Sequence, residues 1–109
     1  MAYDEALAAR IREHTAGEPV VERKMFGGLA FLLGGHMAVA ASREGGLMLR
    51  VEPVQTAALL DEPGASPFEM RGRELDGWLR VSAEAVSDDV DLERWVERGL
   101  AYVRSLPPK

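Results

Sequence analysis

The sequence predicts an α+β fold in which helices pack against one face of an antiparallel sheet. Apolar residues recur at helical spacing near both ends of the chain, around Leu7 and around Trp95. Between these segments, short apolar runs alternate with glycine pairs that suit tight hairpin turns. Helices at the ends and hairpins between them indicate a two-layer sandwich of the order α-β(3–4)-α-β(2)-α.

The first helix is expected over Tyr3 to Ala16. Within it, Leu7 and Ile11 lie four residues apart, so they share one side of the helix. Acidic residues at its start complement the helix dipole. Gly17 and Pro19 favour an end to the helix directly afterwards.

A meander of three or four antiparallel strands is expected next. The expected strands are Val20–Met25, Gly28–Leu33, His36–Ser42 and Leu47–Glu52. Gly34-Gly35 provides the two positive φ angles that a two-residue hairpin turn needs. In the last of these strands, Arg50 alternates with the apolar Leu49 and Val51, so its side chain should face away from the core.

A short helix and two further strands are expected in the following segment. Pro53 suits the first turn of a helix, and this helix is expected over Val54 to Asp61. Residues 65–68 are interpreted as a loop, followed by strands over Phe68–Arg71 and Leu75–Val81. Three short helices cover one face of the sheet at most, so the other face must be solvated or covered by a partner.

The last helix is expected to run from an N-cap at Ser87 to Leu106. Three aspartates within residues 88–91 lie in its first turn, where they complement the helix dipole, and this position explains the acidic cluster without a metal ion. Gly99 lies on the apolar stripe, where glycine costs about 1 kcal/mol relative to alanine. We therefore expect the helix to approach another element closely at this residue.

Length, charge and composition limit the possible classes of protein. The 109 residues fit one domain, 1–109. The net charge of −5 disfavours a nucleic-acid-binding protein, because affinity for phosphate depends on clustered cations. The absence of cysteine excludes disulfides and thiolate sites. There is no apolar stretch of the roughly 18 residues that a membrane-spanning helix needs. The first residues lack the layout of a signal peptide, so a cytoplasmic location is expected.

The sequence contains no recognisable catalytic or metal-binding constellation. His14 is expected to be partly buried at a helix end, and His36 is expected to be exposed after a hairpin turn. Their spacing does not suit a metal site. The serines form no nucleophile elbow, and the glycine pairs form no phosphate loop. We therefore expect no enzymatic activity, no metal and no cofactor.

The glycine pair Gly27-Gly28 is the most unusual local feature. Two glycines at the start of a strand indicate an unusual backbone, a bulge or a close approach by another chain. Met25 and Phe26 directly before them either fill the core or form an adhesive surface, and packing in the core is favoured because apolar residues beside a sheet usually point inward.

Several cations lie on or near the predicted strands. One interpretation is a solvated sheet face on which they meet acidic partners such as Glu52 and Glu69. The other is a face that binds an anion or a partner. Together with the glycine segment, the candidate binding residues are Lys24, Met25, Phe26, Gly27, Gly28, Arg50, Arg73 and Arg80.

An ordered set of short motifs resembles a known family. The motifs are Lys24-Met25-Phe26-Gly27-Gly28, Phe31, Gly35, Leu47-Met48-Leu49-Arg50, Pro67-Phe68, Gly72-Arg73, Gly77-Trp78, Trp95-Val96 and Leu106-Pro107. At these spacings the chain resembles stand-alone members of the TfoX N-terminal domain family over nearly its whole length. The resemblance implies a secretion-chaperone-like α+β fold that is often homodimeric. It also implies a role related to that of bacterial competence regulators, which act as transcriptional coactivators.

Two differences from the family limit which of its properties we expect in this chain. Longer members have a second, helical domain, and this sequence stops at Lys109, so the fold is expected to carry over better than the competence role. The run Ala38–Ala41 has small residues where the family leads us to expect an aromatic side chain.

Three functions agree with these observations. The first is a non-enzymatic regulatory or adaptor module that binds a protein partner through its sheet or an edge strand. The second is a nucleic-acid-associated transcriptional regulator, and the third is a small enzyme of unknown reaction. We expect a homodimer, because an open sheet leaves edge strands that must be paired or protected. We expect neither strong direct binding to nucleic acid nor a membrane association.

Overall fold

The computed structural model describes residues 3–25 and 27–108 of the chain. In chain order its main elements are α1 (Glu5–His14), β1 (Val21–Met25), β2 (Gly28–Leu33), β3 (His36–Ala41), β4 (Leu47–Arg50), α2 (Thr56–Leu59), β5 (Ala65–Met70), β6 (Arg73–Val81) and α3 (Asp89–Arg104). Two short 3₁₀ helices, η1 (Pro53–Gln55) and η2 (Glu84–Val86), precede α2 and α3. In this part of the chain no helix is long and apolar enough to cross a membrane.

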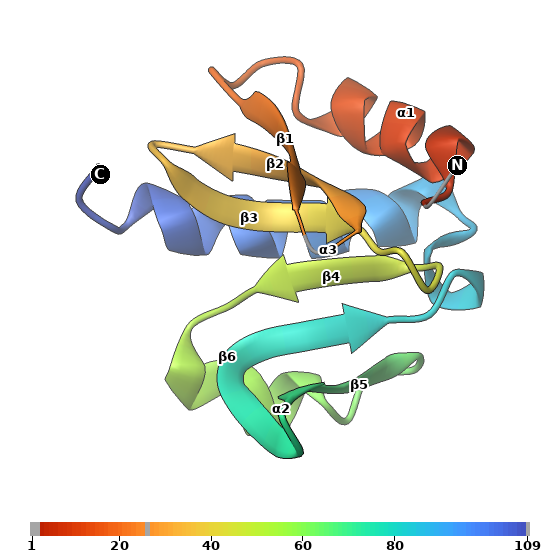
Figure 1. Cartoon of the computed structure of the whole chain (residues 1–109), viewed down its shortest axis with the longest axis vertical. Helices are drawn as coiled ribbons and strands as arrows, with labels where there is room; N and C mark the ends of the chain where they lie inside the picture. Colours follow the sequence, from red (N-terminus) through yellow and green to blue (C-terminus); the bar gives the residue numbers. More distant parts are fainter. Residues whose placement is uncertain (1–2, 26, 109) are drawn as a thin grey trace.

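The strands form one open antiparallel sheet in the order β1-β2-β3-β4-β6-β5 (Figure 1). Consecutive strands are joined by short turns, except where α2 lies between β4 and β5. Gly34 and Gly35 have φ values of 62° and 85°, which confirms the predicted hairpin turn. The α+β class and the antiparallel sheet are thus confirmed, whereas the likeness to secretion chaperones remains a prediction.

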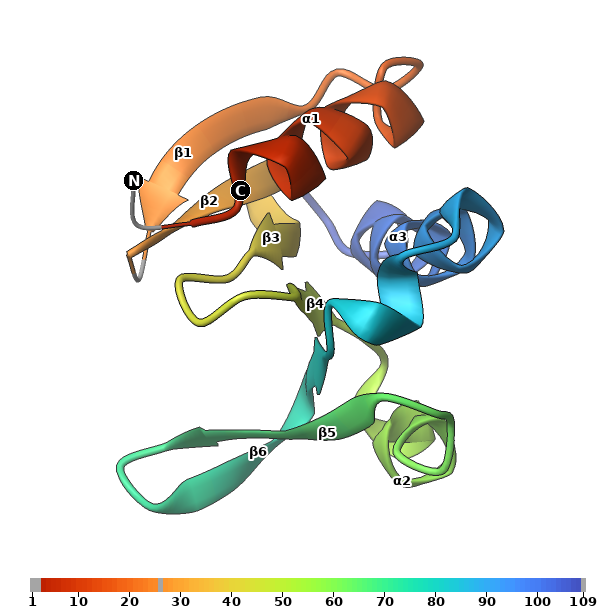
Figure 2. The same cartoon turned by 90° about the vertical axis from the view of Figure 1, so that its right-hand side faces the viewer.

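All three α-helices lie on the same side of the sheet (Figure 2). We call the face that they cover the inner face; it carries Phe31, Leu49 and Leu79, which are fully buried. Ile11 of α1 and Trp95 of α3 join them in the main core. The predicted apolar stripes of the first and last helices therefore form this core, which stabilises the fold mainly by removing apolar surface from water.

Helix α3 comes closest to the sheet at Gly99. A Cβ atom at this position would lie 2.6 Å from the carbonyl oxygen of Ala38, so no larger residue fits without a shift. The pairing of β2 with β3 is irregular at the same place, because Phe31 pairs with Val39 while Leu32 pairs with Met37, which leaves Ala38 as an additional residue. The predicted close approach is confirmed, and its partner is a β-bulge.

Several boundaries differ from the sequence-based expectation. Strand β5 begins at Ala65, so the loop expected over residues 65–68 is wrong. The helix expected over Val54 to Asp61 is a 3₁₀ turn followed by a single helical turn. Helix α3 begins after Asp88. Ser87 is therefore not its N-cap: its hydroxyl donates to the carbonyl oxygen of Glu84 and closes the preceding 3₁₀ turn at 2.9 Å.

Candidate functional site

The face of the sheet opposite the helices, which we call the outer face, has an apolar cluster of its own. Strand pairing places Ala30 beside Ala40, and Ala40 beside Met48, across three neighbouring strands. These side chains point away from the main core because they alternate with its residues along each strand. The buried members of the cluster are Ala30, Leu32, Met37, Ala40 and Met48.

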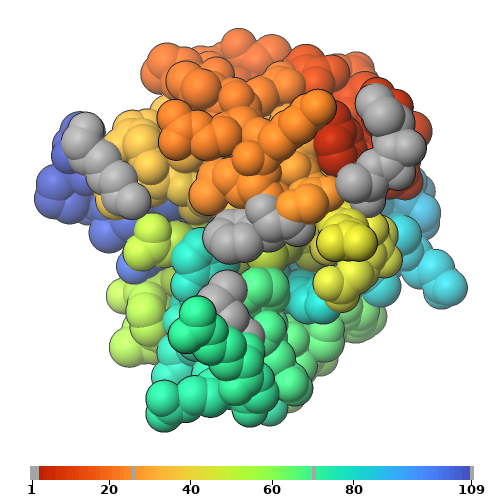
Figure 3. Space-filling model, in the orientation of Figure 1, coloured from red at the N-terminus to blue at the C-terminus, as the bar shows by residue number. Residues whose placement is uncertain are grey.

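The curl of the sheet closes over this cluster from two sides. Met25, at the end of β1, and Phe68 and Trp78, on the β5–β6 hairpin, are half-buried and pack against it. The rings of Phe68 and Trp78 lie 6.2 Å apart between centroids. In Figure 3, which looks onto the outer face, the orange residues around β1 lie above and the green hairpin lies below. These side chains bury the cluster, whose members are at most 6% exposed, so the outer face has a second, smaller core rather than an open apolar surface.

Arg50 lies on this face, as the alternation in β4 predicts. It pairs with Trp78 in the strand register, and its guanidinium lies 5.4 Å from the centroid of the Trp78 ring. It also lies 5.6 Å from the ring of Tyr102 on α3. The pairing of β3 with β4 ends at Leu49, one residue before Arg50. Two aromatic faces thus hold the cation in position.

The remaining predicted cations are not all brought together. Arg80 also lies on the outer face, beside Met48, and forms an ion pair with Glu44 rather than with the expected Glu52 or Glu69. Lys24 is exposed but pairs with Leu29, which places it toward the inner face. Arg73 is exposed at the far end of the hairpin. In the described part of the chain, Arg50, Lys24 and Arg73 have no carboxylate within 4.0 Å.

The glycine pair has a structural explanation inside this chain. Gly27 has a φ of 77°, which L-amino acids with side chains rarely adopt. A Cβ atom at Gly28 would overlap the carbonyl oxygen of Ala41. The alternative of an unusual backbone is thus confirmed at Gly27, and the close approach at Gly28 is made by the end of β3 within this chain. Of the two apolar residues before the pair, Met25 packs on the outer-face cluster rather than in the main core, and Phe26 lies outside the described residues.

Trp78 and Met48 are central to the outer face, yet sequence reasoning did not select them as site residues. Period-two alternation in β6 puts Trp78 on the same face as Arg80 and opposite to Leu79. The sequence pattern was therefore sufficient to predict that Trp78 lies on the outer face. A shallow hollow of about 440 Å³ lies beside Trp78. It is lined by Arg71, Arg73, Glu74, Leu75, Asp76 and Trp78.

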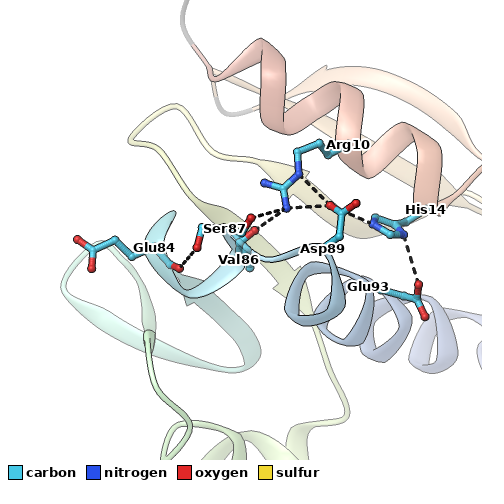
Figure 4. A network of polar contacts seen from close by, with 7 residues as sticks. All are labelled: Arg10, His14, Glu84, Val86, Ser87, Asp89 and Glu93. Carbon is cyan, nitrogen blue, oxygen red and sulfur yellow. Dashed lines mark hydrogen bonds and ion pairs between the residues drawn. The ribbon is translucent and has the colours of Figure 1, made fainter.

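The polar network between α1 and α3 links the helices (Figure 4). Arg10 donates through Nη2 to the carbonyl oxygens of Val86 (2.8 Å) and Ser87 (3.1 Å) and through Nε to Asp89 Oδ1 (3.1 Å). The hydrogen bond from this guanidinium lowers the pKa of the Asp89 carboxyl. Arg10 satisfies carbonyl groups at the end of η2, and Asp89 lies in the first turn of α3 as the helix-start interpretation predicts.

The two histidines lie far apart in different settings. His14 is half-buried at the end of α1, as expected, with Nε2 3.7 Å from Asp89 and Nδ1 3.8 Å from Glu93. His36 is half-buried rather than exposed, because its Nε2 donates to the carbonyl oxygen of Pro107 at 2.8 Å. Within residues 3–25 and 27–108, no group of three or more histidine or acidic side chains is arranged to hold a metal ion.

Comparison with known proteins identifies one family. Residues 12–102 match the TfoX N-terminal domain, a span that covers every strand, α2 and most of α3. This match confirms the resemblance drawn from the ordered motifs. Among curated proteins, none matches the sequence significantly.

Proposed function

The chain belongs to the TfoX N-terminal domain family, and we propose that it is a non-enzymatic regulatory or adaptor module that binds a protein partner through the outer face of its sheet. The observation that carries this proposal is the difference in charge between the two faces. We further propose that the partner connects the module to transcriptional or competence regulation, as the family's best-known members suggest.

The arginines of the helical layer are neutralised within the chain. Arg94 and Arg98 of α3 contact Glu62, and Arg104 contacts Glu18 and Glu97. Arg10 and Arg12 of α1 are likewise paired, with Asp89 and Glu22. Because the chain as a whole carries a net charge of −5, this layer presents the acidic excess to solvent.

The outer face is different, because two of its arginines have no carboxylate partner among the described residues, although Arg80 pairs with Glu44. Arg23 pairs with Ala30 in the register and is exposed on this face, and Arg50 lies beside Trp78. Neither has a carboxylate within 4.0 Å among the described residues. Complementary charge steers association and suppresses wrong partners, so an acidic partner would approach this face and be repelled by the helical one.

The apolar part of the outer face suggests how such a partner is held. Tryptophan and arginine are enriched among the residues that dominate binding energy at interfaces, and Trp78 and Arg50 lie side by side here. Met25, which packs against the same cluster from β1, is a flexible side chain that adapts to different surfaces. The partner that fits is a protein segment with apolar side chains flanked by aspartate or glutamate.

A nucleic-acid partner is the alternative that one observation favours. An unpaired arginine beside aromatic rings, as Arg50 is here, also suits single-stranded bases, which stack on such rings. The overall acidity opposes this function, because a negative field repels phosphate. In fluorescence anisotropy at about 150 mM salt, we expect only weak binding to duplex and single-stranded oligonucleotides, without sequence preference.

The proposal is tested by comparing two charge reversals in affinity capture from the native cell extract. Arg50→Glu changes the outer face, whereas Arg94→Glu makes the same charge change on α3, where surface ion pairs contribute little to stability. We expect Arg50→Glu to lose the proteins captured by the wild type and Arg94→Glu to retain them, with nuclease treatment changing neither result.

Two results would contradict the proposal. Equal capture by both variants would show that the outer face is not the binding surface. Loss of capture after nuclease treatment, together with sub-micromolar sequence-dependent binding in the anisotropy titration, would favour the nucleic-acid alternative instead.

We also propose that the module is a homodimer. Its open sheet has two edge strands, β1 and β5, and unpaired edges in native proteins are generally protected or paired.

A further inference from the structure

The two edges of the sheet differ in their capacity to pair with another strand. Strand β5 contains Pro67, which has no N–H to donate, and its register with β6 shifts between Pro67 and Glu69. Such features protect an edge against pairing. Strand β1 has neither: its five residues pair with β2 in one continuous register, from Val21 to Met25.

The side chains of β1 are largely open to solvent. Val21 through Lys24 are all exposed, and Val21 is a large apolar side chain that is 59% exposed. The register with β2 places Val21, Arg23 and Met25 toward the outer face, because they pair with Leu32, Ala30 and Gly28. Glu22 and Lys24 point toward the inner face.

From the sequence of this strand we infer that β1 pairs antiparallel with β1 of a second copy, around a two-fold axis at Arg23. In this register Val21 of one copy lies opposite Met25 of the other, and Glu22 lies opposite Lys24. Each contact occurs twice, as an isologous interface requires. The inference rests on the homodimer proposed above and does not depend on the partner-binding site.

The pairing suits the chemistry on both faces of the extended sheet. On the outer face, Val21 and Met25 would cover each other's apolar surface. On the inner face, the Glu22 carboxylate is already oriented by Arg12, whose Nε and Nη2 donate to it at 2.5 and 2.9 Å. Lys24 of the second copy would then approach a carboxylate that is held in place. Opposite charges directly across two strands stabilise the pair.

Two copies of Arg23 would meet on the axis, and this contact is unfavourable. Like charges directly opposite each other destabilise a strand pair, so the register predicts that removal of this charge strengthens the dimer. It also places the two outer faces side by side on the same side of one continuous sheet, because a two-fold axis normal to the sheet does not exchange its faces.

Charge reversal tests the register by analytical ultracentrifugation of the full chain. Lys24→Glu places two carboxylates opposite each other at both Glu22 contacts, and Glu22→Lys places two lysines together twice, so each variant should weaken the dimer about tenfold or more. An equimolar mixture of these two variants places every lysine opposite a glutamate, so it should form heterodimers about as tightly as the wild type. Circular dichroism checks that each variant is folded.

A second measurement tests the position of the axis. Arg23→Thr should tighten the dimer severalfold, because it removes the like-charge contact and threonine suits a strand. Arg73→Thr, which removes a charge at the far end of the hairpin, should leave the dimer unchanged. A dimer that neither the reversals nor Arg23→Thr affect would overturn the β1 interface while leaving the homodimer intact. A chain that remains an 11.9 kDa monomer at high concentration would overturn both.

Discussion

The two faces of the sheet are built from the same strands but bury their side chains in different ways. The inner face packs against α1 and α3 around fully buried residues such as Phe31 and Trp95. The outer face has only a small cluster of alanine, leucine and methionine, which the curl of β1 and of the β5–β6 hairpin closes (Figures 1 and 2). The inner face therefore holds the larger core, and on the outer face the half-buried Met25, Phe68 and Trp78 keep part of their surface exposed to solvent.

This difference gives different expectations for substitutions on the two sides. Truncation of large side chains on the inner face should lower the stability of the fold strongly and should have little direct effect on partner binding. Truncation of side chains on the outer face should lower stability less and should weaken binding of the partner.

Trp95→Ala should have the largest effect. The Trp95 side chain is completely buried in the main core, and the guanidinium of Arg98 lies 4.5 Å from its ring. Truncation of such a side chain costs about 3–5 kcal/mol. Denaturant unfolding followed by circular dichroism should show a correspondingly lower midpoint or an unfolded chain. An unchanged midpoint would show that α3 does not form the core described here.

Gly99→Ala should destabilise the fold by about 1–3 kcal/mol, as overpacking does. The added methyl group would lie 2.6 Å from the carbonyl oxygen of Ala38 and 3.0 Å from a methyl group of Val39. Gly17→Ala is the matched control, because a Cβ atom there meets nothing within 4 Å. If both variants had the same unfolding midpoint, the close approach of α3 to the bulge in β3 would be contradicted.

Trp78→Ala compares most directly with Trp95→Ala, because it removes the same side chain from the other face. Trp78 is only half-buried and packs on the smaller cluster, so its loss should cost about 1 kcal/mol, well below the cost of a core tryptophan. We nevertheless expect it to abolish capture of the protein partner. A loss of stability equal to that of Trp95→Ala would remove the distinction between the two faces.

Asp89→Asn should have the smallest effect, and this effect should depend on pH. Arg10 lowers the pKa of Asp89 in the folded chain below its unfolded value, so the carboxylate contributes stability above the unfolded pKa of about 3.9. That contribution is lost as the pH falls through the folded pKa. The wild type should therefore exceed Asp89→Asn in stability at about pH 7 and lose this advantage at about pH 2.

The control for this measurement is Asp61→Asn. Asp61 is exposed and has no cation within 4.0 Å in the part of the chain that the structure describes. Its substitution should change stability equally at both pH values. A difference between wild type and Asp89→Asn that does not shrink in acid would contradict the proposed link between Arg10 and Asp89.

The fold was largely predictable from sequence because its signals are local. The stripe around Trp95 and the turn at Gly34-Gly35 each follow from a period or a dihedral requirement within a few residues. The predicted N-cap of α3, Ser87, lies one residue before the actual N-cap, Asp88. Two contacts explain the difference: Arg10 of α1 donates to the carbonyl oxygen of Ser87, and the Ser87 hydroxyl donates to the last turn of η2. Strand β5 was placed too late because its start at Ala65 depends on pairing with Val81, which short-range patterns do not reveal.

The candidate site was less predictable, because it depends on the curl of the whole sheet. Alternation placed Arg50 and Arg80 on one face correctly. It could not show that Phe68 and Trp78 would fold over Met48, or that Arg80 would be neutralised by Glu44. The role of Gly28 was also hidden, since the atom that excludes a side chain there belongs to Ala41 on a different strand.

Site-specific photocrosslinking in the native cell shows whether a protein binds to the outer face of the sheet. The photoreactive amino acid p-benzoylphenylalanine would replace Trp78 on the outer face and, in a matched chain, Val90 on α3, which is 80% exposed. We expect discrete crosslinked products from position 78 that protease removes and nuclease does not, and none from position 90. Crosslinks from position 90 alone, or products at position 78 that nuclease removes, would contradict it.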